Sequence, residues 1–188
     1  ADGTSLAIIM NDINRAYSGE KLEPEGYTSY DLALDNRDAL AGDIYKNAEN
    51  YYKSVFENAG GSISFYPDKN GAAPTAELYH RETRSISVQD VKEFCKKHGI
   101  TENVFFISAF GITLGKYNFK KDAVFTTIYH GRNDSRLSET VGMLVKTLPV
   151  FCDFSGTAKD CLDGVQKQLI DSMNNDIYPF SQISHEFN

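Results

Sequence analysis

Tryptophan is absent from the 188 residues, and cysteine and proline are scarce, with three and five copies. The cysteines, Cys95, Cys152 and Cys161, are odd in number and scattered, without a CxxC pair or a Cys/His cluster at zinc spacing. This pattern excludes a disulfide framework and a structural zinc site, and no metal is expected. Each cysteine falls within an apolar pattern, which predicts buried free thiols in a reducing compartment.

Two further absences limit the class of function. No apolar run reaches the ~20 residues of a membrane-spanning helix, and the first residues, 1–4, lack the basic region of a signal peptide. An excess of basic residues is also missing, because the net charge is −7 and the pI about 5.1. Non-specific nucleic-acid binding needs a basic face. We therefore expect a cytoplasmic protein that binds neither nucleic acid nor membrane.

The apolar residues that are present recur with helical and strand periods. Helical spacing predicts helices over 4–17, 37–58, 88–98, 101–114, a long one after Thr157 and another near Ser181. β-Branched and aromatic runs predict strands over 62–66, 76–87 and 122–129 and within 141–154. Residues 19–36 and 67–74 are predicted to be connecting loops. This order indicates an α/β fold class, with a mixed sheet covered by helices.

The packing of several elements follows from the same pattern. The helix over 4–17 is expected to be capped by Thr4 or Ser5. It is expected to use one apolar face, formed by Leu6, Ile9, Met10, Ile13 and Tyr17. The stretch 104–114 is apolar nearly all round, so its helix is expected to be buried. Pro149 is expected near an edge or a bend of its strand. In the helix over 88–98 the inward side chains are expected to be Val88, Val91, Phe94 and Cys95.

Motifs for nucleotide binding and serine nucleophiles are missing. There is no GxGxxG, no P-loop and no GxSxG. Asp160 and Asp163 lie on one predicted helix beside Lys159 and Lys167, which indicates surface ion pairs rather than paired catalytic carboxylates.

Four other segments carry a more specific signal. Asp2-Gly3 precedes the first helix, and a Tyr-Thr-Ser-Tyr stretch covers 27–30, with Tyr51-Tyr52 in the next predicted helix. A predicted strand leads to Gly131-Arg132, and residues 141–149 then read VGMLVKTLP. Residues 175–180 read NDIYPF.

In this order the segments resemble the condensation domain of non-ribosomal peptide synthetases, which has a chloramphenicol-acetyltransferase-like fold. Asp2-Gly3 would close the family's His-His-x-x-x-Asp-Gly motif, with Ala1 as its last variable residue. Ser29 stands where the family's Tyr-x-Asp-Tyr/Phe has aspartate, and Lys146 where its Val-Asn-Thr has asparagine. Residues 175–180 resemble Asn/His-x-Asp-x-Pro-Phe with one extra residue. Because the family's domain is more than twice as long, the resemblance implies an internal piece: residues 1–36 the tail of an N-terminal lobe plus a linker, and 37–188 a partial C-terminal lobe.

The resemblance implies an amide-forming acyltransferase, in which the amine of one carrier-bound substrate attacks the thioester of another. The family assigns the acid/base or positioning role to the second histidine of the motif, which would precede Ala1. His80, His98, His130 and His185 lie outside the motif, so we expect the chain alone to be inactive. Epimerisation and cyclisation on the same scaffold stay open.

The resemblance also suggests where site residues lie. No catalytic residue is assigned beyond the motif remnant Asp2 and Gly3. Asp2 is expected either to hold the motif loop through an ion pair or to lie exposed at a frayed end. His130, Arg132, Val145 and Thr147 are candidate substrate-tunnel residues. Arg132 is expected to pair a carboxylate, orient a phosphate or stay solvated, and for His130 we favour a hydrogen-bonded, partly exposed place at a strand end.

The implied partners are peptidyl and aminoacyl carrier protein domains and the N-terminal lobe of the same domain. The substrates would arrive on phosphopantetheine arms, with no bound cofactor. The alternative is a catalytically inactive condensation-like domain that serves as a carrier-protein docking or structural platform. The interface toward the other lobe is expected to make the isolated chain self-associate.

Overall fold

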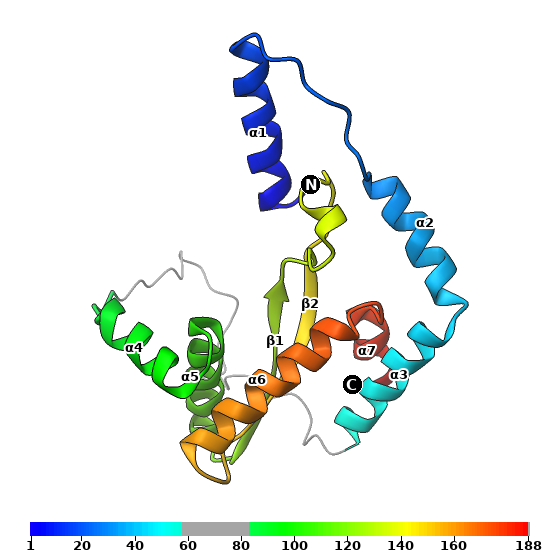
Figure 1. Ribbon diagram of the computed structural model, residues 1–188. Coiled ribbons are helices and arrows are strands. Elements are labelled where there is room, and N and C mark those ends of the chain that lie inside the picture. The colour runs from blue at the N-terminus through cyan, green and yellow to red at the C-terminus, as the bar shows by residue number, and fades with distance from the viewer. Residues whose placement is uncertain (58–82, 188) are drawn as a thin grey trace, which may run out of the picture. The chain divides into compact units, whose positions relative to one another are not determined.

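The computed structural model describes residues 1–57 and 83–187, which form seven α-helices, one 3-10 helix and two strands (Figure 1). The elements in chain order are α1 Gly3–Tyr17, α2 Ser29–Leu40, α3 Asp43–Phe56, α4 Val88–His98, α5 Glu102–Tyr117, β1 Asp122–Tyr129, η1 Ser135–Leu137, β2 Lys146–Asp153, α6 Ala158–Asn174 and α7 Phe180–Phe187. This mixture agrees with the α/β class. Across these two ranges no helix is both long and apolar enough to cross a bilayer.

Side-chain caps fix most helix starts where the sequence predicts them. The hydroxyls of Ser87 and Thr101 accept hydrogen bonds from backbone N–H groups in the first turns of α4 and α5, and Thr157 does the same for α6. The prediction for α1 is wrong, because its cap is Asp2 rather than Thr4 or Ser5. A carboxylate accepts these bonds as well as a hydroxyl does and also favours the positive end of the helix dipole.

The predicted loop 19–36 and helix 37–58 are divided differently in the structure. Thr28 and Asp31 form a capping box that starts α2 at Ser29. That helix ends at Leu40, and α3 begins after Gly42. Apolar residues keep their helical spacing across the break between α2 and α3. The spacing alone therefore predicts one helix where the structure has two.

The predicted strand 62–66, the loop 67–74 and residues 76–82 lie outside the described residues. Residues 83–87, the end of the predicted strand 76–87, have no regular structure. The second strand of the 122–154 region starts at Lys146 and includes Pro149. In the sheet that the described residues form it is an edge strand, which agrees with the place predicted for Pro149. β1 and β2 pair as a two-stranded sheet. They run antiparallel, because the Phe154 N–H just beyond β2 donates to the Lys121 carbonyl just before β1 at 3.0 Å.

The chain divides into two compact units, whose boundaries fall inside β1, β2 and α6. One unit takes residues 83–125 and 150–168 of the described chain. In it Gly111 of α5 lies so close to Cys152 that a Cβ on the glycine would come within 2.6 Å of the sulfur. The three cysteines are buried free thiols, as predicted, and Cys152 and Cys161 have their sulfurs 3.4 Å apart.

Helices α4 and α5 of this unit bury fewer of their apolar side chains than the sequence predicts. α5 buries a face of small and branched residues, while Phe106 and Phe110 on its other side are about half exposed. In α4 Cys95 is buried, but Val88 is 65% exposed. A helix that is apolar all round therefore does not have to be covered all round.

The other unit takes residues 1–57, 126–149 and 169–187 of the described chain. Its core cluster contains Ala48 and Tyr52 of α3, Tyr178 just before α7 and Ile183 of α7. The rings of Tyr52 and Tyr178 are stacked, and their centroids lie 5.9 Å apart. The predicted apolar face of α1 is present but uncovered, since its side chains are 37–91% exposed: Leu6, Ile9, Met10, Ile13 and Tyr17.

Candidate functional site

The Asp2 carboxylate is the centre of a buried hydrogen-bond network at the start of α1. Its Oδ1 accepts from the backbone N–H of Ser5 at 2.8 Å, which is the cap of the helix. Its Oδ2 accepts from the backbone N–H of Leu144 at 3.1 Å. The backbone N–H of Asp2 in turn donates to the Gly142 carbonyl at 3.2 Å. One residue thus joins the helix start to the chain segment that leads into β2.

Arg132 supplies the charge that balances Asp2. Its Nη2 lies 3.1 Å from Asp2 Oδ1, and the two side chains are only 7% and 3% exposed. Its Nη1 donates to the carbonyls of Leu137 at 2.5 Å and Thr140 at 2.9 Å. Of the alternatives left open from the sequence, the structure shows the ion pair for Asp2 and the carboxylate partner for Arg132, and not a frayed Asp2 or a solvated Arg132. That the two residues are each other's partner was not predicted. A buried pair of this kind holds its surroundings because each ion leaves an uncompensated charge if the other is removed.

Ser5 completes this network, and the sequence interpretation treated it only as a helix cap. Its side chain is fully buried, and its Oγ lies 2.8 Å from Asp2 Oδ1 and 2.7 Å from the Gly142 carbonyl oxygen. It also accepts from the Gly142 N–H at 3.0 Å and from Arg132 Nη2 at 3.3 Å. We refer to Asp2, Ser5 and Arg132 as the ion-pair hub. A serine three residues after an aspartate at a helix start gives no sign in the sequence of this long-range role.

The backbone around Arg132 requires glycine at one position. Gly131 has a φ of +69°, and a Cβ there would lie 1.9 Å from the Leu144 carbonyl oxygen. Only glycine allows both the left-handed backbone and this close approach. The Gly-Arg pair therefore works as a unit, since the glycine lets the chain turn and the arginine then reaches Asp2.

The hub keeps Asp2 ionised. Hydrogen bonds from the Ser5 backbone and hydroxyl, from the Leu144 backbone and from Arg132 hold the pKa of the Asp2 carboxyl well below its ordinary value, although burial acts in the opposite direction. Asp2 is therefore a charged structural acceptor at neutral pH and not a proton donor.

The remaining candidate residues lie in two different surroundings. His130 is exposed, and its Nδ1 accepts from the Arg132 backbone N–H at 2.9 Å, the strand-end arrangement favoured from the sequence. Val145 and Thr147 line a cavity of about 370 Å³, and His130 is not part of its lining. Val145 and Thr147 thus line one cavity and Arg132 pairs with Asp2, whereas His130 is absent from the cavity lining and contacts the Arg132 backbone.

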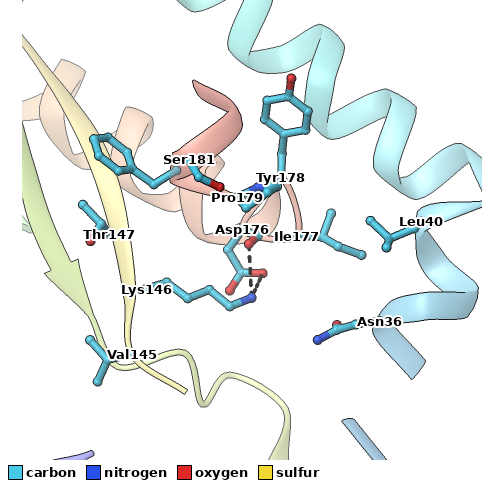
Figure 2. Close-up of a pocket in the computed structure, with 11 residues that line it drawn as sticks. Asn36, Leu40, Val145, Lys146, Thr147, Asp176, Ile177, Tyr178, Pro179 and Ser181 are labelled. Atoms are coloured by element: carbon cyan, nitrogen blue, oxygen red, sulfur yellow. Dashed lines mark hydrogen bonds and ion pairs between the residues drawn. The ribbon is translucent and has the colours of Figure 1, made fainter. Parts of the chain in front are cut away.

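Lys146, between those two residues, forms an ion pair inside the cavity (Figure 2). Its Nζ lies 2.9 Å from Asp176 Oδ1 and 3.1 Å from the Asp176 carbonyl oxygen. The apolar part of the wall comes from the end of α2, the residue before β2, the turn before α7 and the first residue of α7: Leu40, Val145, Ile177, Pro179 and Phe180. The sequence interpretation noted Lys146 as a departure from the family and did not pair it with Asp176.

A second cavity of about 500 Å³ shares part of this wall, including Lys146 and Asp176. It extends to Gly131 and Leu144, which adjoin the hub. Within residues 1–57 and 83–187 no group of three or more histidine, cysteine or acidic side chains is arranged to hold a metal ion.

Comparisons with known proteins agree with this geometry. The family model of the Condensation domain matches residues 1–188. Among curated proteins, the chain is 29% identical to the nonribosomal peptide synthetase sidC of Arthroderma benhamiae over 97% of this chain. It is 26% identical to surfactin synthase subunit 1 of Bacillus subtilis over 100% of this chain. It spans only 4% and 5% of the length of these two relatives.

The fold has solved counterparts. The first condensation domain of the calcium-dependent antibiotic synthetase superposes on this chain with a TM-score of 0.76 at 16% identity. The match covers 100% of this chain and 43% of that one. At this identity the likeness establishes the chloramphenicol-acetyltransferase-like fold expected from the sequence. Because the family model covers every residue, the chain belongs to the condensation domain family.

Proposed function

We propose that this chain is part of a condensation domain that forms an amide bond between aminoacyl or peptidyl thioesters held on carrier proteins. The observation that carries the proposal is the buried ion pair between Asp2 and Arg132. In the family motif three variable residues separate this aspartate from the second histidine, to which the acid/base or positioning role is assigned. The Asp2 backbone N–H donates to the Gly142 carbonyl, and the Asp2 carboxylate accepts from the Leu144 N–H. These bonds hold Asp2 in place and therefore also restrain the residues that would precede it.

The proposed reaction sets clear requirements. A neutral amine nitrogen attacks the thioester carbonyl carbon, a C–N bond forms, and the C–S bond breaks to release a thiol. The proton lost by the amine ends on the departing sulfur. The tetrahedral intermediate carries charge on oxygen and needs donors near it. The motif histidine would assist the proton transfer, and Asp2, held ionised in the hub, would position that histidine's loop without exchanging protons.

The partners and cofactors follow from the same proposal. Carrier proteins would deliver both substrates on phosphopantetheine arms, in the cytoplasm, and the domain itself would bind no cofactor. We also keep the assignment of residues 1–36 to the tail of an N-terminal lobe with its linker, and of 37–188 to part of the C-terminal lobe. His130, Val145 and Thr147 remain proposed tunnel residues, and Arg132 acts near the tunnel through the hub.

An amide-forming assay tests the proposal. The longest natural protein that contains this sequence is mixed with loaded donor and acceptor carrier proteins, beside the 188-residue chain alone. Amide product from the longer protein, and its loss in an Arg132→Leu variant that still folds, is the expected result. No product with any of several amino acids would contradict the proposal and favour the inactive docking platform. Product from the 188 residues alone would refute the placement of the chemistry before Ala1.

The apolar face of α1 fits the same proposal. Leu6, Met10 and Ile13 are exposed on one side of α1, and the chain covers less than half of the solved condensation domain. We propose that the rest of the domain covers this face, and that a second copy covers it when the chain is alone. Light scattering should show a mass that rises with concentration, and Ile13→Ser should reduce that rise, whereas a concentration-independent monomer would contradict it.

A further inference from the structure

The Lys146–Asp176 pair differs from an ordinary surface ion pair in what surrounds it. Lys146 and Asp176 are partly buried, with side chains 35% and 23% exposed, and both line the cavity of about 370 Å³. Figure 2 shows the lysine extending across the cavity from β2 to Asp176. The exposed counterpart on α6, Lys159 with Asp163, has about half of each side chain in solvent.

The pair has unused bonding capacity on both partners. An ammonium group has three N–H donors, and Lys146 uses two of them toward the Asp176 carbonyl and Oδ1. Among the described residues, no donor is found for Oδ2 of Asp176 and no second acceptor residue for Lys146. One donor of a cation and one oxygen of an anion therefore remain for a ligand, side by side and in a partly water-excluded cavity where charge-assisted hydrogen bonds are strong.

The charge balance of the cavity selects the kind of ligand. A ligand with a single charge would be attracted to one partner and repelled by the other. A ligand that carries both charges close together avoids this repulsion, because its anionic group faces Lys146 while its cationic group faces Asp176. An α-amino acid has this arrangement, with ammonium and carboxylate on the same carbon. The apolar wall formed by Leu40, Ile177 and Phe180 would take its side chain, and the volume suits a small molecule.

The cavity is also close to the hub along the chain. Leu144 donates its N–H to Asp2, and Lys146 follows two residues later. Two residues of extended chain span roughly 7 Å. A molecule bound at Lys146 would therefore lie near the backbone that the hub holds in place.

We propose that the Lys146–Asp176 pair and its cavity bind the zwitterionic α-amino group and carboxylate of a free α-amino acid. This assigns a ligand class to a position where the family has asparagine. Any use of the bound amine as an acyl acceptor rests on the function proposed above, but the binding itself does not.

Binding is measured by titrating the 15N-labelled 188-residue chain at pH 6 with L-leucine and L-phenylalanine. Matched probes remove one charge at a time: 3-phenylpropionate lacks the ammonium, and L-phenylalanine amide lacks the carboxylate. The expected result is saturable shifts in residues 145–147 and 176–181, with the zwitterion binding about tenfold or more tightly than either matched probe.

Variants that remove one charge test whether amino-acid binding depends on the Lys146–Asp176 pair. Lys146→Met keeps the apolar stem and removes the charge, and it should weaken binding of L-phenylalanine about tenfold. Asp176→Asn should do the same and serves as the test if Lys146→Met fails to fold. Lys159→Met on α6 is the matched control and should leave binding unchanged.

Three results would overturn the inference: no saturable binding of either amino acid, equal binding of the singly charged probes, or full binding by folded Lys146→Met and Asp176→Asn. These results are separate from the test of the proposed function. Amide synthesis by the longer protein without amino-acid binding would refute only this inference, and binding without amide synthesis would refute only the proposed function.

Discussion

Two ion pairs in the same compact unit look alike by distance and differ in everything else. Asp2 and Arg132 lie 3.1 Å apart, and Lys146 and Asp176 lie 2.9 Å apart. The first pair is almost fully buried and is surrounded by further hydrogen bonds to Ser5, Leu144 and the carbonyls of 137 and 140. The second is partly open to a cavity and has spare donors and acceptors.

The difference separates a structural role from a binding role. In the buried pair, Arg132 Nε has no hydrogen-bond partner among the described residues, but it is closed off from solvent and so is not available to a ligand. Such a pair has much to lose when one partner is removed. A partly exposed pair contributes little to stability, because water competes with each partner. Distance alone would have grouped the two pairs, whereas burial and unused hydrogen-bonding capacity distinguish them.

The largest expected effect comes from breaking the buried pair. Arg132→Leu leaves the Asp2 carboxylate buried beside a neutral side chain, and the free energy of unfolding should fall by about 3–5 kcal/mol in urea denaturation. Arg136→Leu, in the nearby 3-10 helix η1, is the control. Arg136 is an exposed arginine paired with Asp35 and Asp134, so its loss should be below ~1 kcal/mol. Equal losses in the two variants would mean that the hub is no more important than a surface pair.

Acid should weaken the hub in a smaller step. The folded-state pKa of Asp2 lies below its ordinary value of 3.8, so the unfolded chain binds the proton more readily. The contribution of Asp2 is then complete above about pH 4 and is lost as the pH falls through the folded-state pKa. The stability difference between the natural chain and Asp2→Asn should shrink between pH 6 and pH 3. Urea midpoints at several pH values measure it. For exposed Asp160, whose pKa is lowered by hydrogen bonds from Thr157, Asp160→Asn should show a weaker dependence.

Ser5→Ala tests the neutral member of the hub. The change removes a hydroxyl that lies within hydrogen-bond distance of Asp2, Gly142 and Arg132, and leaves those buried groups short of a partner. The expected loss in the free energy of unfolding is about 1–3 kcal/mol. Ser18→Ala provides the comparison, because the exposed Ser18 hydroxyl, directly after α1, donates to the Asn14 carbonyl of that helix. A loss in Ser5→Ala as small as in Ser18→Ala would remove Ser5 from the hub.

These residues differ in how far the sequence could foresee them. An ion pair at Asp2 and a carboxylate partner for Arg132 followed, as alternatives, from two motif fragments 130 residues apart in the chain, but the pairing of these two residues with each other did not. Ser5 and the pair of Lys146 with Asp176 did not, because which distant side chains meet depends on the folded backbone and not on local period. Helix caps such as Thr101 were predictable because they act within one turn.

The fold shows the same division. Most helices and β1 were predicted from period and caps, whereas the break between α2 and α3 was missed because apolar spacing continues through it. The exposed face of α1, from Leu6 to Tyr17, could not be predicted either. An amphipathic pattern indicates that one face of a helix is apolar, but it does not indicate whether other residues of the same chain cover that face.

The smallest expected change in stability is also the sharpest test of the comparison. Lys146→Met removes one partner of a pair that is partly open to water, so the free energy of unfolding should change by less than ~1 kcal/mol. Methionine keeps an apolar stem of similar length in the cavity wall, which limits the loss of packing. Urea denaturation measures this change on the same scale as Arg132→Leu. If Lys146→Met costs as much as Arg132→Leu, the second pair is a structural element like the first, and the cavity loses the feature that marks it as a binding site.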